Sequence, residues 1–213
     1  MNAVMTLAQK RERYRQELKS EVLEAARAIF LRDGFDGFSM RKLAERVGCS
    51  PGAIYLHFAS KDDLFEAVVE ESFARLHERL SIVVDDHRSE PVLALKRGLR
   101  IYVDWGLENP DAYRIAFIVG RPANRPYATH AAFEVARTIV GRCLAGASDS
   151  EREAAAQAVW AAVHGVTSLL IQRPTFPWVS RDRIIEDVID GAVLGAVSGK
   201  NREPRGGQDG KRP

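Results

Sequence analysis

The chain has 213 residues, of which 46% are hydrophobic and 28% are charged. This length suffices for one large domain or two small ones, and the composition excludes wholesale disorder, collagen and a coiled-coil fibre. No run approaches 18 uninterrupted apolar residues, so no membrane span is expected, and the basic stretch at 1–15 lacks the apolar segment of a signal peptide. Two cysteines, Cys49 and Cys143, are too few for a disulfide framework and match no metal spacing. We therefore expect a protein of the reducing cytoplasm without a metal or cofactor.

Charge is divided unevenly along the chain. Residues 1–61 hold 11 Lys/Arg and 7 Asp/Glu, a net charge of +4, whereas residues 62–199 carry −5 and residues 200–213 carry +3. A basic head on an acidic body indicates that only the head faces a polyanion. Ordinary surface variation is the alternative explanation of this difference.

Apolar periodicity and capping residues predict helices through most of the chain. No segment alternates with the period of a strand, so the expected fold class is all-α. We predict that Gly34 and Gly48 end the first two helices, and that Ser39, Ser50, Ser60, Ser150 and Ser180 begin later ones. Glu153 would complete a capping box with Ser150. The predicted helices are 18–33, 40–47, 51–58, 61–84, 91–108, 110–119, 128–145, 151–173 and 181–198.

The most informative segment is 39–58, which holds a short helix, a three-residue turn with glycine, and a second short helix. This spacing is typical of a helix-turn-helix, in which the first helix braces the second across the DNA major groove. Leu43, Ile54 and Phe58 would face inward, which leaves Tyr55 and His57 on the outer face. Small residues at the start of the second helix would let it approach base edges closely.

Residues 35–65, FDGFSMRKLAERVGCSPGAIYLHFASKDDLF, resemble the DNA-binding segment of the TetR (tetracycline-repressor-like) family of bacterial transcriptional regulators. A second likeness, Trp160-Ala-Ala-Val-His-Gly165, resembles the motif of the WHG-type C-terminal domain within that family. The family implies a three-helix DNA-binding domain followed by a larger helical domain for ligand binding and dimerisation. We accordingly expect a basic flexible arm at 1–17, the helix-turn-helix domain at 18–60, the effector-binding and dimerisation domain at 61–199, and a disordered tail at 200–213.

The resemblance also implies roles for individual residues, and none of them is catalytic. Contacts with operator DNA would come from Ser39, Arg41, Ser50, Pro51, Gly52, Ala53, Tyr55, His57 and Lys61. Gly52 and Ala53 have little hydrogen-bonding capacity, so base readout would depend on Arg41, on thymine methyl groups and on DNA shape. Arg11, Arg13 and Arg15 either reach into the minor groove or form a frayed start to the first helix.

In the family, the last two helices pair with those of a second subunit, and central helices enclose an effector. The expected homodimer would match a palindromic operator. The candidate interface residues are Ala158, Ala162, Ile184, Val188, Ala192 and Gly195. The candidate pocket residues are Tyr102, Trp105, Tyr113, Phe117, His130 and Phe133. Aromatic residues on helices are also ordinary core residues; as a pocket they would favour an apolar or aromatic small molecule.

His164 follows Trp160 by one helical turn and has no metal-binding company, so we expect a partly buried histidine bonded to another helix. These features predict a DNA-binding regulator, a repressor that a small molecule releases. The alternatives are a DNA-binding regulator controlled by a protein partner, and a helical ligand-binding protein or enzyme. No catalytic triad, phosphate loop or metal pair in the sequence supports an enzyme.

Overall fold

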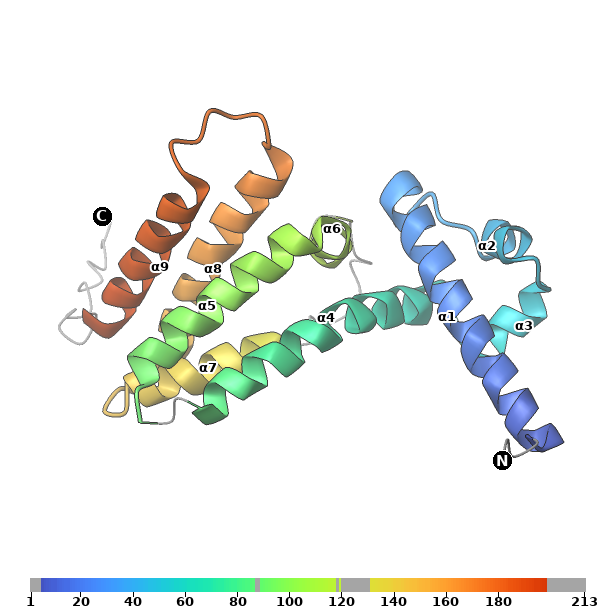
Figure 1. Cartoon of the computed structure of the whole chain (residues 1–213), viewed down its shortest axis with the longest axis horizontal. Helices are drawn as coiled ribbons and strands as arrows, with labels where there is room; N and C mark the ends of the chain where they lie inside the picture. The colour runs from blue at the N-terminus through green and yellow to red at the C-terminus, as the bar shows by residue number, and fades with distance from the viewer. Residues whose placement is uncertain (1–4, 87–88, 118, 120–130, 199–213) are drawn as a thin grey trace, which may run out of the picture. The chain divides into compact units, whose positions relative to one another are not determined.

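The computed structural model of the chain describes residues 5–86, 89–117, 119 and 131–198 (Figure 1). All regular secondary structure within those ranges is helical, which confirms the predicted all-α fold class. The predicted disordered tail at 200–213 lies outside the described residues, as does His130.

The chain divides into two compact units. The first comprises residues 1–75 and 109–128, and the second comprises residues 76–108 and 129–213. The division falls inside the fourth helix, α4 (Lys61–Asp86), which therefore contributes residues to both units.

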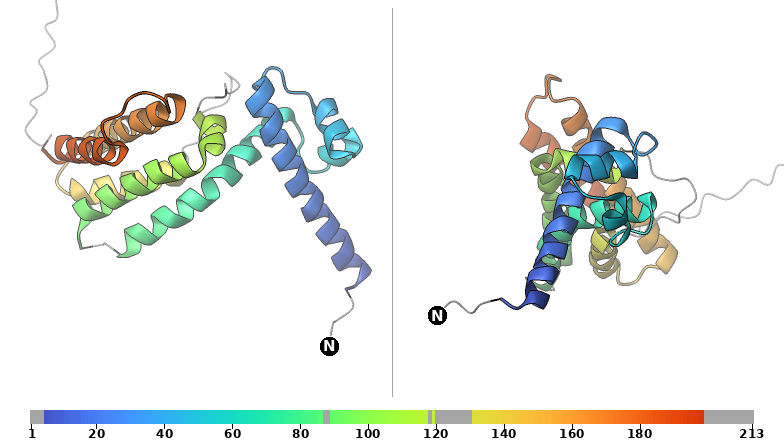
Figure 2. Two further views of the ribbon diagram at one scale, coloured as in Figure 1. Left: turned by 45° about the horizontal axis from the view of Figure 1, so that its top comes forward. Right: turned by 90° about the vertical axis from the view of Figure 1, so that its right-hand side faces the viewer.

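The first unit contains the helix-turn-helix. In it, α2 and α3 lie together beside α1 (Figures 1 and 2). Its core is aromatic: Phe30 is fully buried, stacks on Phe38 with ring centroids 4.1 Å apart, and meets the edge of Phe65 at 4.9 Å. Besides the start of α4, the helices of this unit are α1 (Leu7–Asp33), α2 (Met40–Val47), α3 (Pro51–Tyr55) and α6 (Pro110–Phe117).

The turn between α2 and α3 has the geometry that its glycine permits. Gly48 adopts the left-handed conformation, with φ +77° and ψ 28°, and its N–H bonds to the carbonyl of Ala44. Gly34 ends α1, as predicted, and also has a positive φ, +72°, but its ψ of 178° is extended, so the expectation that it would form a left-handed cap is wrong. The predicted Ser39 cap is also incomplete, because its backbone is extended but its hydroxyl makes no capping hydrogen bond.

The first helix begins at Leu7, about three turns before the predicted start at Leu18. Thr6 and Gln9 form a reciprocal capping box: the Gln9 N–H donates to Thr6 Oγ1 at 3.3 Å, and the Thr6 N–H donates to Gln9 Oε1 at 2.8 Å. Residues 7–17 of the predicted flexible arm are therefore helical in the structure.

The second unit is built around α5, which packs against α7, α8 and α9. α8 and α9 run side by side as an antiparallel pair (Figure 2). The Arg100 guanidinium on α5 bonds to Asp182 and Glu186 on α9, at 2.8 Å each. Besides the end of α4, the helices of this unit are α5 (Pro91–Glu108), α7 (Ala131–Cys143), α8 (Asp149–Gln172) and α9 (Arg181–Ser198).

Several predicted helix ends shift by a few residues. α8 begins at Asp149 and not at Glu151, because Ser148 and Glu151 form its capping box in place of Ser150 and Glu153. The N–H of Arg183 bonds to Ser180 Oγ at 3.3 Å, which confirms the predicted cap of α9. α3 ends at Tyr55, three residues before the predicted end, while α4 runs two residues further than predicted, to Asp86.

Candidate nucleic-acid interface

The helix predicted to read DNA, α3, is short and is fixed by its cap. Ser50 Oγ accepts a hydrogen bond from the Ala53 N–H at 3.2 Å, and Pro51 occupies the first turn, where no N–H donor is needed. Ile54 is completely buried, whereas the Tyr55 side chain is 52% exposed, as the helical spacing predicted. The exposed residues here are Ser50, Pro51, Gly52 and Tyr55, whereas Ala53 is half-buried.

Gly52 has room for a side chain. A Cβ built on it would meet only Ser50 Oγ, at 3.8 Å, which is an ordinary van der Waals distance. Glycine inside a helix costs about 0.5–1 kcal/mol relative to alanine, so the packing of this unit gives no reason for glycine at this position. A surface that approaches the backbone of α3 closely would give one.

The bracing helix α2 presents Arg41 at its first turn. The Arg41 side chain is 83% exposed, and its Nε lies 3.5 Å from Glu45 Oε1 on the same helix. Such an exposed pair is worth about 0–1 kcal/mol, so it does little to restrain the guanidinium. Ser39, one residue before α2, is half-buried.

Lys61 stands at the first residue of α4. Its Nζ lies 4.1 Å from the centre of the Phe35 ring, a cation–π contact that fixes the ammonium beside the helix-turn-helix. Phe35 in turn meets the edge of Phe65 at 5.3 Å. The aromatic core of the first unit therefore sets the position of this predicted DNA contact.

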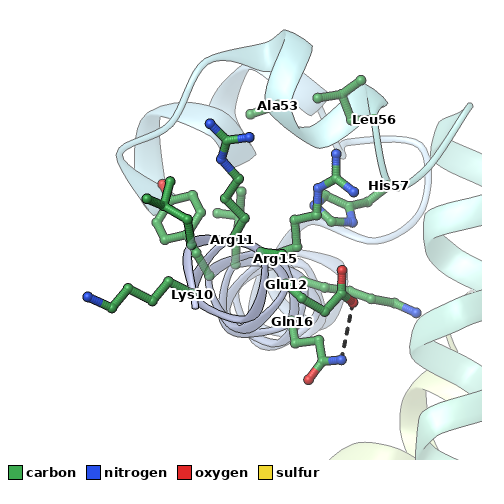
Figure 3. Close-up of a pocket in the computed structure, with 13 residues that line it drawn as sticks. Lys10, Arg11, Glu12, Arg15, Gln16, Ala53, Leu56 and His57 are labelled. Atoms are coloured by element: carbon green, nitrogen blue, oxygen red, sulfur yellow. Dashed lines mark hydrogen bonds between the residues drawn. The ribbon is translucent and has the colours of Figure 1, made fainter. Parts of the chain in front are cut away.

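His57 is half-buried and lines a groove that the sequence did not predict. The groove, of about 1100 Å³, lies between the N-terminal half of α1 and the residues around α3 (Figure 3). Ala53, Leu56 and His57 line it on the α3 side, and the lining residues of α1 include Lys10, Arg11, Arg15 and Lys19. The sequence offered Arg11 and Arg15 either as minor-groove contacts or as part of a frayed helix start, whereas Lys10 and Lys19 were not expected at a site. Residues 7–17 carry no apolar periodicity, so the Thr6–Gln9 capping pattern was the available signal for the helix that positions them.

The predicted pocket residues fall into both units. Tyr113 and Phe117 belong to the first unit, where Phe117 contacts the rings of Tyr113 and Phe73 at centroid distances of 4.8 and 5.4 Å. Tyr102, Trp105 and Phe133 belong to the second. Tyr102, Trp105 and Tyr113 are buried, whereas Phe117 and Phe133 are half-buried.

His164 on α8 bonds to another helix, as the sequence predicted. Its Nδ1 lies 3.3 Å from the hydroxyl of Tyr102 on α5, and its ring lies 5.7 Å from that of Trp160. Trp160 in turn meets Phe133 at 5.7 Å. Burial lowers the pKa of His164, so the imidazole is held neutral near physiological pH.

This pKa direction makes folding stability depend on pH. Because His164 has a lower pKa in the folded than in the unfolded chain, the unfolded chain binds the proton more tightly, and stability should fall as the pH drops below about 6.5. The His164→Gln variant lacks this titrating imidazole. Urea unfolding at about pH 7.5 and about pH 5.5 should therefore show a smaller loss of stability in the variant than in the wild type. An equal loss in both proteins would contradict the prediction.

The predicted interface residues are not part of the buried core of the single chain. Ala158 and Gly195 are exposed, and Ala162, Ile184, Val188 and Ala192 are half-buried. On the outer side of α8, the exposed residues Ala154, Ala158 and Ala161 follow one another at helical spacing. The inward faces of this helix pair carry other residues: Val159, Val163, Val166, Ile185, Ile189 and Val193.

The described ranges give little support for a metal site or a membrane span. No group of three or more His, Cys, Asp or Glu residues there could hold a metal ion. By length and composition alone, α8 would be apolar enough to cross a membrane, but a core helix passes the same test. The apolar side chains of α8 that face inward form part of the core of the second unit.

The fold and this surface define a class of protein: a helix-turn-helix protein with an appended helical domain. Comparisons with known proteins define it further. Residues 22–68 match the sequence model described as "Bacterial regulatory proteins, tetR family", and residues 95–192 match "Tetracyclin repressor-like, C-terminal domain". The chain belongs to the tetR family of bacterial regulatory proteins, which are transcriptional regulators and not enzymes.

Individual relatives agree with this assignment. The chain is 35% identical over 95 residues to the HTH-type transcriptional repressor AcnR of Corynebacterium glutamicum, a match that covers 45% of this chain and only 43% of AcnR. The fold resembles that of NalD, the secondary repressor of the MexAB-OprM multidrug efflux pump in Pseudomonas aeruginosa, with a TM-score of 0.66 and 18% identity over 84% of this chain and 95% of that one. It also resembles TetR-Q116A of Acinetobacter baumannii in complex with minocycline, with a TM-score of 0.60 and 23% identity over 85% and 97% of the two chains.

Proposed function

We propose that this protein is a DNA-binding transcriptional repressor of the cytoplasm that binds a palindromic operator as a homodimer. The observation that carries the proposal is the outer face of the helix-turn-helix. Arg41, Tyr55 and the Gly52 backbone are exposed there, while the residues behind them are buried. Exposed Arg and Tyr side chains can bind base edges and phosphates, and an uncovered helix backbone can approach the groove floor.

The same geometry supports a homodimer. A single helix as short as α3 reaches only a few base pairs, so one subunit contributes few specific contacts. Two subunits related by a two-fold axis read two half-sites about 34–36 Å apart. The exposed alanines on the outer side of α8 offer an uncharged face for a second copy.

Selection of bound duplexes from a random library tests the proposal directly. We expect an enriched palindrome whose half-sites lie about one helical turn apart. Binding without any preferred sequence, or a single unrepeated half-site, would contradict the proposal.

Substitutions should separate backbone contacts from base readout. Tyr55→Ala and Lys61→Ala should weaken binding equally to operator and random duplex, because phosphate contacts carry no sequence information. Arg41→Ala should cost about 1–3 kcal/mol on the operator alone and relax preference at one position in each half-site. Titrations at several salt concentrations measure all three effects, and wild-type binding by every variant would refute the assigned surface.

We further propose that a small molecule releases the repressor from DNA. The half-buried rings of Phe133 and Trp160, with the Tyr102–His164 pair beside them, would bind an apolar or aromatic compound. A protein with the same fold, TetR-Q116A, is known in complex with minocycline. Because α4 contributes residues to both units, it would transmit the conformational change from the compound to the helix-turn-helix. The compound can weaken DNA binding only by preferring the DNA-free form, and a tenfold preference corresponds to about 1.4 kcal/mol of coupling free energy.

A further inference from the structure

The N-terminal half of α1 is a regular helix and not a loose arm. The Thr6–Gln9 capping box begins it, and an ion pair between Arg13 Nε and Glu17 Oε1, at 2.7 Å, joins successive turns. Side chains on this segment therefore project from fixed positions. A helix presents residues four apart on one face, so Arg11, Arg15 and Lys19 form a row about 6 Å apart along the axis.

That row faces the groove beside α3. In Figure 3, Arg11 and Arg15 point from α1 toward the side that Ala53 and His57 form, while Gln16 points away. Lys10 and Lys19 add positive charge to the lining, and Glu12 is its single carboxylate, accepting a hydrogen bond from the Gln16 amide at 3.3 Å.

Among the described residues, the two arginines of the groove have no carboxylate partner. Within the part of the chain that the structure describes, no carboxylate lies within ion-pair distance of Arg11 or Arg15. Arg13, on a different side of the same helix, is neutralised by Glu17. Arginine guanidinium groups bind phosphate with good geometry, so unpaired arginines around a groove fit a polyanion.

We propose that Arg11 and Arg15 bind the operator's phosphate backbone where it flanks the bases that α3 reads. This inference rests on the proposed function, because the groove and the predicted DNA-binding surface share Ala53 and His57. They line the groove and also belong to the surface assigned to DNA. A duplex bound to α3 would therefore bring its own phosphate backbone to the groove. Any other anionic partner could reach the groove only by displacing the DNA. The contacts extend the bound length of DNA without adding sequence preference.

The salt dependence of binding tests the proposal. Two phosphate contacts per subunit make four per dimer, so the Arg11→Ala/Arg15→Ala double variant should lower the slope of log K against log salt by about 3 to 4. The loss should be equal on operator and on random duplex. Arg13→Ala is the matched control: it removes the same side chain from the same helix, but one already paired with Glu17, and should leave the slope unchanged. Alanine is the best helix former, so neither change should unwind α1.

Two further measurements complete the design. The Arg11→Lys/Arg15→Lys variant should restore most of the slope, because lysine keeps the charge. Operators trimmed to the two half-sites should lose affinity for the wild type but not for the double alanine variant. A double variant with the same slope as Arg13→Ala would overturn the inference, even if the wild type still prefers its operator. A wild type without sequence preference would instead refute the proposed function.

Discussion

Replacing Ala158 with arginine should break the dimer and abolish operator binding. Ala158 is exposed in the single chain, so arginine can be accommodated there without disturbing the core, and arginine is nearly as good a helix former as alanine. In a dimer built on this face of α8, the guanidinium would be desolvated and unpaired. Uncompensated burial of one charge costs about 3–5 kcal/mol, which would by itself weaken dimerisation by roughly two to four orders of magnitude.

Thr138→Arg provides the matched control for this prediction. Thr138 is also exposed and helical, but it lies on α7 and is not among the residues that we assign to the interface with the second copy. Sedimentation velocity should show a monomer for Ala158→Arg and a dimer for Thr138→Arg, and only the latter should retard operator DNA. An intact Ala158→Arg dimer would exclude this face of α8 from the interface.

The helix-turn-helix could be predicted from sequence because short-range chemistry determines it. Gly48 allows the left-handed turn, Ser50 caps the next helix, and Pro51 fits the first turn. Once that register is set, Ile54 must face inward and Tyr55 outward. The exposure of Ser50, Gly52 and Tyr55 follows from the same local register.

The start of α1 could not be predicted from periodicity, since residues 7–17 bury no side chain. A helix with no packed face has no apolar period, and only its capping box and ion pair mark it. The start of α8 was ambiguous for another reason: Ser148 with Glu151 and Ser150 with Glu153 both have capping-box spacing. The structure uses the earlier pair, and the Arg152 side chain there bonds to the carbonyls of residues 144 and 145.

The groove beside α3 depends on how α1 lies against the helix-turn-helix, so no local pattern could locate it. The assignment of the aromatic residues depends on tertiary packing in the same way. Tyr113 and Trp105 are both aromatic residues within predicted helices, yet they belong to different compact units. Periodicity marks both as inward-facing without showing which core each one enters.

Replacing Phe30 with alanine should have the largest effect on stability. Phe30 is fully buried and contacts the rings of Phe38, ahead of α2, and Phe65, on α4. Truncation of a buried phenylalanine costs about 3–5 kcal/mol, against a total stability of about 5–15 kcal/mol for a typical protein. Urea unfolding, followed by circular dichroism, measures the loss.

Two companion variants show whether this loss belongs to the aromatic cluster. Phe176→Ala removes a phenylalanine that is 55% exposed in the second unit, and should change stability by less than about 0.5 kcal/mol. Phe30→Leu keeps most of the volume, and should cost less than about 1.5 kcal/mol. Because the Phe30 cluster joins α1 to the segments that carry Arg41 and Lys61, operator affinity should fall with Phe30→Ala and largely recover with Phe30→Leu. A Phe30→Ala protein that unfolds like the wild type would show that this cluster does not hold the recognition helix in place.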